Sequence, residues 1–292
     1  PFEIPADPRK LVPFWREHLP RLGENGRTVI VVDAVNQLES GVRDTSWLPL
    51  GGLPPGVKLI VSYRRGAEET DALLERFARN PDVRIATVRP FDNEDDRREL
   101  VDRYLRQYLK ELDAEHVEPI IHADGAANPL YLKVVLSELR VFGSFPGLRE
   151  KIEHDFGPTP VTAFTALLRR LEGDPSYEAL DPRSAVPMVF GLLLHARRGL
   201  SAPELGALLL DEMKLPETRR DDAAEEVQML LRQAAAFLCR RDGLFDYFYE
   251  SFELASRDRY VVGAEGAVDS AQPATAWHSA LADHFARQPL FL

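Results

Sequence analysis

Two apolar runs near the N-terminus constrain the fold of this chain more than any other feature. The first, Thr28–Asp33, is β-branched, does not alternate and closes on an acidic residue, and the second, Val57–Ser62, follows a proline- and glycine-rich turn. Runs of this kind are typical of strands buried on both faces of a parallel sheet. A third run, Val83–Val88, follows an amphipathic stretch at 68–77. The alternation of strands and helices predicts an α/β layer over residues 1–89.

From Arg89 onward the pattern is helical. Apolar residues within 91–112 share one helical face, and Asp92 or Asn93 supplies a capping side chain ahead of an acidic first turn. Further helices are expected over 11–22, 114–123 and 129–141. These patterns predict a small all-helical unit at residues 90–153.

Residues 154–292 are expected to form helix, helix, helix, short hairpin, helix, with the hairpin turning at Asp242-Gly243. Three helices followed by a hairpin describe a winged helix. Cys239 lies in an apolar strand without a nearby histidine, so we expect a packed thiol rather than a nucleophile. The aromatic residues around the hairpin are expected to pack in the core rather than to form a stacking platform for bases: Phe245, Tyr247, Phe248, Tyr249 and Phe252.

Composition excludes several classes of protein. The chain has 292 residues, of which 45% are hydrophobic, and this content excludes a disordered regulator. A net charge of -11 argues against a nucleic-acid binder, which usually presents a basic face. The single cysteine excludes an internal disulfide and every cysteine-based zinc pattern, and it favours a reducing cytoplasm. The histidines show no H-E-x-x-H or similar ligand set, and no apolar run reaches the roughly 18 residues of a membrane helix.

Asp33 is the first candidate functional residue. A buried strand that ends in aspartate delivers a carboxylate to the carboxyl edge of a parallel sheet, where it can hold Mg²⁺ on a nucleotide phosphate, as in a Walker B strand. The same pattern also fits an aspartate that merely caps the next turn, so the motif needs support from its neighbours.

The order of the neighbouring segments supplies that support. It resembles the NACHT branch of the STAND signalling ATPases, in particular large NACHT proteins that carry WD40 or TPR repeats. The segments that carry the resemblance cover nearly the whole chain: Val29–Leu38, Trp47–Leu50, Leu53–Ser62, Asn128–Lys133, Ser137–Gly143, Gly199–Leu205, Phe248–Phe252 and Ala282–Phe285.

The resemblance implies an ATP-binding switch, with a role such as immune or antiphage defence. Its fold would be the C-terminal half of an α/β P-loop NTPase sheet at 1–89, a helical lid at 90–153 and a winged-helix domain with a trailing helix at 154–292. Such a switch closes over ADP at rest and self-associates when triggered, and its sensor and effector domains would lie outside this chain. Nucleotide and Mg²⁺ are the implied cofactors.

The resemblance also assigns roles to single residues. Asp33 would coordinate Mg²⁺, and Asn36 stands where many relatives place an acidic residue that helps to activate water. Arg64 or Arg65, directly after the second strand, would reach the terminal phosphate, although a solvated loop arginine is the alternative. Pro129 would lie against adenine, unless Asn128-Pro129 is simply a helix cap followed by a first-turn proline.

Three departures qualify these roles. Asn36 cannot act as a base, so hydrolysis in the parent protein is expected to be slow. No Gly-x-x-x-x-Gly-Lys-Ser/Thr occurs in the sequence, so we expect the segment to begin after the phosphate loop and to bind nucleotide weakly on its own. Glu250 stands where relatives often place a phosphate-contacting histidine, and its carboxylate would repel phosphate.

Two alternatives remain open at this stage. The first is a scaffold or protein-interaction module of the same fold without catalysis. The second is a winged-helix DNA binder, whose recognition helix would span Asp221–Ala236. This helix carries four acidic residues against Arg232, and DNA affinity depends largely on basic residues, so DNA binding is the weaker alternative.

Overall fold

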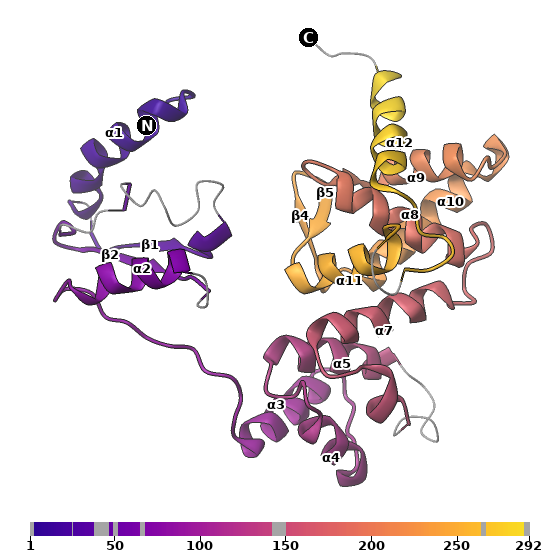
Figure 1. Ribbon diagram of the computed structural model, residues 1–292, viewed down its shortest axis with the longest axis horizontal. Coiled ribbons are helices and arrows are strands. Elements are labelled where there is room, and N and C mark those ends of the chain that lie inside the picture. The colour runs from indigo at the N-terminus through magenta and orange to yellow at the C-terminus, as the bar shows by residue number, and fades with distance from the viewer. Residues whose placement is uncertain are drawn as a thin grey trace. The chain divides into compact units, whose positions relative to one another are not determined.

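The structure is a computed structural model that describes residues 3–24, 26–37, 47–48, 52–64, 68–141, 150–263 and 267–288. The chain divides into two compact units, Pro1–Val88 and Arg89–Leu292 (Figure 1). Among the described helices, none combines the length and the apolar character that crossing a membrane requires.

The first unit opens with the helix α1, Pro8–His18, and a 3₁₀ turn, η1, Leu19–Gly23. The side chain of Asp7 caps α1 by accepting a hydrogen bond from the backbone N–H of Arg9 at 3.0 Å. The helix expected at 11–22 is therefore present, but it starts earlier and its last turn is tighter. A cap followed by proline in the first turn explains the earlier start.

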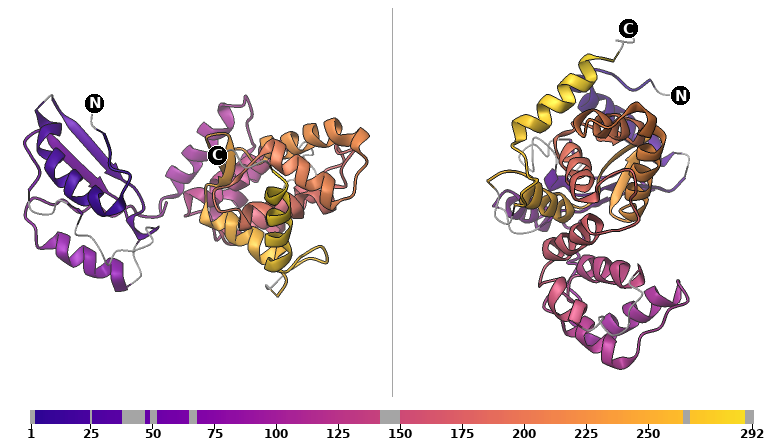
Figure 2. Two further views of the ribbon diagram at one scale, coloured as in Figure 1. Left: turned by 90° about the horizontal axis from the view of Figure 1, so that it is seen from above. Right: turned by 90° about the vertical axis from the view of Figure 1, so that its right-hand side faces the viewer.

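The two N-terminal runs form a parallel pair of strands, β1, Thr28–Val32, and β2, Val57–Val61 (Figure 2). Their register runs from Thr28 opposite Val57 to Val32 opposite Val61, so the two strands end level with each other. The helix α2, Glu68–Ala78, packs Leu73 and Phe77 into the cluster that includes Leu59 and Val61. The expected positions of both strands and of α2 are confirmed.

The expectation that these strands are buried on both faces is wrong for the described part of the unit. Val29, Val31 and Ile60 point away from the α2 side and are 57%, 64% and 55% exposed. Their β-branched character suits a face that another element covers, but no described element of this unit buries them.

The third expected strand, Val83–Val88, is also wrong. Over these residues the chain forms no strand, and Ile85 and Val88 are 49% and 95% exposed. A strand exists only where a neighbouring backbone completes its ladder of hydrogen bonds. Among the described residues, no strand pairs with this run, so its β propensity is not realised.

The second unit begins with α3, Glu94–Arg106, α4, Ala114–His122, and α5, Pro129–Val141. Asn93 caps α3 by accepting a hydrogen bond from the N–H of Asp95 at 3.0 Å, as the sequence predicts. The helix expected over 91–112 ends early, however. Leu109 adopts a left-handed backbone with φ of 55° and is 97% exposed. The helix therefore ends before this residue, and the apolar face predicted to extend to residue 112 is cut short.

The rest of this unit is mainly helical, with a three-stranded antiparallel sheet of order β3-β5-β4. Four helices, rather than the expected three, precede the hairpin, because separate N-terminal caps at Thr159, Asp181 and Ser201 start new helices. Asp242 and Gly243 turn the hairpin with φ of 51° and 88°, as the Asp-Gly signal predicts. The elements are a π-helical turn η4, Lys151–Asp155; α7, Pro160–Glu172; α8, Pro182–His195; β3, Leu200–Ser201; α9, Ala202–Glu212; η5, Glu217–Arg219; α10, Arg220–Gln233; β4, Leu238–Arg241; β5, Leu244–Tyr247; α11, Glu250–Tyr260; and α12, Ala274–Ala286.

One hydrophobic core runs through the second unit from α3 to α12. Of the hairpin aromatics, Phe252 is fully buried and Phe245, Tyr247 and Tyr249 pack against the core, whereas Phe248 is 61% exposed. Core packing is therefore confirmed for these aromatic residues except Phe248. Cys239 is half-buried, and its thiol approaches the carbonyl oxygen of Tyr247 at 3.8 Å.

Buried polar contacts join α5 to the later helices. Arg170 of α7 donates to the carboxylate of Glu138 at 2.6 Å and to the side chain of Gln233 at 3.1 Å. Glu138 is only 2% exposed, so Arg170 pairs with a carboxylate that water scarcely reaches. Lys133 of α5 donates to the hydroxyl of Tyr249 at 2.9 Å and to the carbonyl of Ala236 at 3.2 Å. These hydrogen bonds therefore connect α5, in the segment expected as a lid, to the hairpin region.

Candidate functional site

The carboxyl ends of β1 and β2 bring Asp33 and Ser62 together. The hydroxyl of Ser62 donates to Oδ1 of Asp33, and the same hydroxyl accepts the backbone N–H of Ala34 at 2.8 Å. Both side chains are exposed at the edge of the sheet. The level ends of the parallel strands place a carboxylate and a hydroxyl, two oxygen groups, side by side at this edge.

A sharp turn after Asp33 fixes the next residues. Ala34 adopts a left-handed backbone with φ of 52°, which non-glycine residues rarely do. The N–H of Val35 then bonds to the carbonyl oxygen of Ser62 at 3.0 Å, and the Val35 side chain is completely buried. This turn leads into a short 3₁₀ helix, η2, Val35–Gln37.

Asn36, within η2, uses its side-chain oxygen to bind the segment that follows β2. Its Oδ1 accepts the backbone N–H of Arg64 at 2.9 Å. The structure thus places Asp33, Asn36 and the backbone of Arg64 at one edge of the sheet. The contact also gives Asn36 a structural role that was not predicted from the sequence. The bond needs only an acceptor oxygen, which several polar side chains could supply, so the residue type alone does not indicate it.

Two predicted site residues lie elsewhere. Arg65 falls outside the described residues. Pro129 is the exposed first residue of α5 in the second unit, and the Oδ1 of Asn128 accepts the N–H of Leu130 at 2.9 Å. Asn128-Pro129 therefore has the geometry of a helix cap, and its predicted contact with adenine stays a prediction.

Glu250 is exposed in the first turn of α11. A carboxylate there interacts favourably with the partial positive charge of the helix N-terminus, which gives this residue a stabilising role.

The expected recognition helix, α10, is tied into the protein through Glu226. Its carboxylate accepts three backbone N–H groups of the segment before α8, from Glu178 and Ala179 at 2.7 Å and from Leu180 at 2.8 Å. An acidic residue on an acidic helix is usually a solvated side chain, so this contact could not be predicted from the residue pattern. Glu226 therefore braces the unit.

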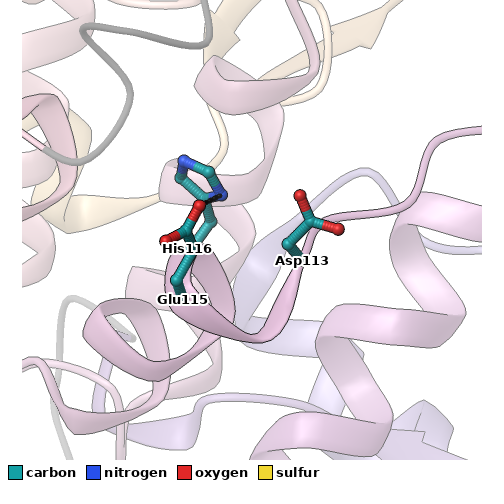
Figure 3. Close-up of side chains that lie close together, drawn as sticks. All are labelled: Asp113, Glu115 and His116. Carbon is teal, nitrogen blue, oxygen red and sulfur yellow. Dashed lines mark ion pairs between the residues drawn. The ribbon is translucent and has the colours of Figure 1, made fainter.

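A second cluster of polar groups lies at the N-terminal end of α4 (Figure 3). Asp113, Glu115 and His116 each bring one possible metal-ligand atom within 4.8 Å of the others. Asp113 and Glu115 are exposed and His116 is buried. Acidic side chains at a helix N-terminus are also explained by the helix dipole alone, so the cluster does not define a metal centre.

Comparison with known proteins gives one distant relative. The chain is 24% identical over 240 residues to a TPR repeat-containing protein of Dictyostelium discoideum, and the match covers 80% of the chain. It spans only 13% of the length of that relative. No protein-family model matches the chain, and no solved structure matches it either.

Proposed function

We propose that the chain is the central part of an ATP-dependent signalling switch of the NACHT type. In this proposal residues 1–89 are the C-terminal half of a P-loop NTPase sheet, 90–153 a helical lid and 154–292 a winged-helix domain, in a longer cytoplasmic protein. The observation that carries the proposal is the grouping of Asp33, Asn36 and Arg64 at the carboxyl edge of two parallel strands.

The edge chemistry fits a hydrated magnesium ion. Asp33 presents an exposed carboxylate beside the Ser62 hydroxyl, and hard oxygen ligands are what Mg²⁺ prefers. Asp33 would hold the ion, and the ion would supply charge neutralisation at the nucleotide phosphates. Asn36 joins η2 to the segment after β2 by accepting the Arg64 N–H. The sequence contains no phosphate-loop lysine, so the grip on the phosphates would come from elsewhere in the longer protein.

A non-catalytic scaffold is the second candidate. The side-chain oxygen of Asn36 is engaged by the Arg64 backbone, and an amide cannot take a proton from water, so the site supports at most slow hydrolysis. The relative is named for its TPR repeats, and repeats of this kind present extended binding surfaces. DNA binding through α10 is disfavoured, because its exposed residues include Asp221, Asp222 and Glu225 and its Glu226 is used internally.

Nucleotide-dependent self-association of the longer protein distinguishes these candidates. A switch should gain mass in light scattering when ATP and Mg²⁺ are added, and Asp33→Asn should abolish that gain. Asp82→Asn, an exposed aspartate of the same unit, is the matched control and should behave like the wild type. A scaffold would associate equally with and without nucleotide, and that result would reject the switch.

A further inference from the structure

The helix α12 docks on α8 through one large aromatic side chain. Trp277 is 2% exposed and lies over Gly191, where a β-carbon would meet its Cζ2 atom at 2.5 Å. Glycine therefore forms a notch in α8 that the indole ring fills. Leu281, one turn further along α12, is also buried in the core.

Two imidazole rings face each other across the same contact. The ring centroids of His195, which ends α8, and His278 of α12 are 5.0 Å apart and perpendicular. The Trp277 ring stacks on His195 with centroids 6.3 Å apart. The Nδ1 of His195 donates to the carbonyl oxygen of Gly191 at 2.8 Å. The ring of His195 is therefore fixed between the notch and His278.

Burial and nearby charged groups disfavour protonation of His195. Burial lowers the pKa of His195, and the neighbouring His278 and Arg257 lower it further, while the bond to Gly191 acts in the opposite direction. Arg257 lies on α11 and is paired with Glu253 at 2.5 Å. On the α9 side, Asp211 pairs with Arg287 beyond the C-terminal end of α12 at 3.1 Å.

The docked helix also buries polar atoms that the rest of the described protein leaves unsatisfied. Trp277 Nε1 and His284 Nε2, both on α12, are buried without a hydrogen-bond partner among the described residues. In solvent each atom would form a hydrogen bond to water, so their burial destabilises the docked state relative to the released state. The docked state thus combines a well-fitting aromatic contact with polar groups that weaken it.

We propose that α12 is a proton-sensitive latch: protonation of His195, held between the notch and His278, releases the helix from α8 and empties the notch over Gly191. In the released state the His195 ring regains an ordinary imidazole pKa near about 6.5, so release takes up a proton. Docking is complete above that pH and weakens below it, by up to about tenfold per pH unit. This latch needs no nucleotide and extends beyond the proposed switch.

Trp277 itself reports the release. In the full chain with Trp15→Phe and Trp47→Phe, it is the single tryptophan. The quenching of its fluorescence by acrylamide is measured between about pH 8 and about pH 5, the range in which histidine titrates. Quenching should rise severalfold as the pH falls, while the helical circular dichroism is retained. His278→Gln should make the transition shallower, because it removes a neighbour that lowers the pKa of His195. His195→Asn with His278→Gln should remove it, and His122→Gln, an exposed histidine of α4, should leave it unchanged.

Three results would overturn the latch. They are quenching that stays constant down to about pH 5, an unaltered transition in the double histidine variant, and quenching that rises only together with the loss of helical signal. Hydrogen exchange of the unmodified chain gives an independent test. After correction for intrinsic exchange, the α12 amides should lose protection at the lower pH while those of α8 keep it, and equal protection at both pH values would also contradict release.

Discussion

Replacing Glu226 by glutamine should destabilise the second unit by about 2–4 kcal/mol, because hydrogen bonds to a charged group each contribute about 1.5–3 kcal/mol. The carboxylate accepts three backbone N–H groups through both of its oxygens, at 2.7, 2.7 and 2.8 Å. Glutamine keeps one acceptor oxygen and turns an NH₂ group toward another donor. At least one bond is then lost and the others lose their charge assistance.

Urea unfolding followed by Trp277 fluorescence measures this change, in the chain with Trp15→Phe and Trp47→Phe. Trp277 belongs to the second unit, so the signal reports the unit that Glu226 braces. Glu225→Gln is the matched control, since Glu225 is its exposed neighbour on α10, and should stay within about 0.5 kcal/mol of wild type. Equal free energies of unfolding for the two variants would refute the bracing role.

Three further predictions concern the site, the pH dependence and DNA. Asn36→Asp in the longer protein should raise steady-state ATP hydrolysis by about 100-fold, a typical contribution of a general base, without unfolding it, since aspartate can still accept the Arg64 N–H; an unchanged rate argues against the assigned position. Burial, together with Asp124, raises the pKa of Tyr131 to about 12. Its neutral form is therefore favoured in the folded state, and stability should fall as pH rises from the unfolded pKa near 10 through about 12. Tyr131→Phe should flatten that part of an alkaline urea-midpoint profile, and an unaltered profile would assign the effect to other groups. The chain should show no salt-sensitive binding to duplex DNA in fluorescence anisotropy. Binding that is lost in Arg232→Ala would show instead that α10 contacts DNA.

Local patterns predicted the elements whose signals lie within a few residues. The β-branched runs predicted β1 and β2, Asn93 predicted the start of α3, and Asp242-Gly243 predicted the hairpin turn. Features that depend on distant partners were missed. Residues 83–88 have strand propensity but no described neighbouring strand, and β3 is a two-residue strand defined by its pairing with β5.

The candidate site shows the same division. The sequence placed Asp33 and Arg64 just after two successive strands, and those strands are parallel and end level with each other. The hydrogen bond from the Arg64 backbone to Asn36 depends on the left-handed turn at Ala34, for which an alanine gives no signal. The three hydrogen bonds to Glu226 join residues about fifty positions apart in the sequence. They could be recognised only in the folded unit, because no local pattern indicates them.

The affinity of the longer protein for ATP, measured by calorimetry with and without Mg²⁺, tests the central claim most directly. If Asp33 holds the ion, Asp33→Asn should weaken binding in Mg²⁺ by about tenfold or more, the loss of one charge-assisted interaction. Binding in the presence of a chelator should not change, because asparagine can still accept the Ser62 hydroxyl and keep the strand ends together. Equal affinities of wild type and variant in Mg²⁺ would contradict the assignment of this sheet edge as a nucleotide site.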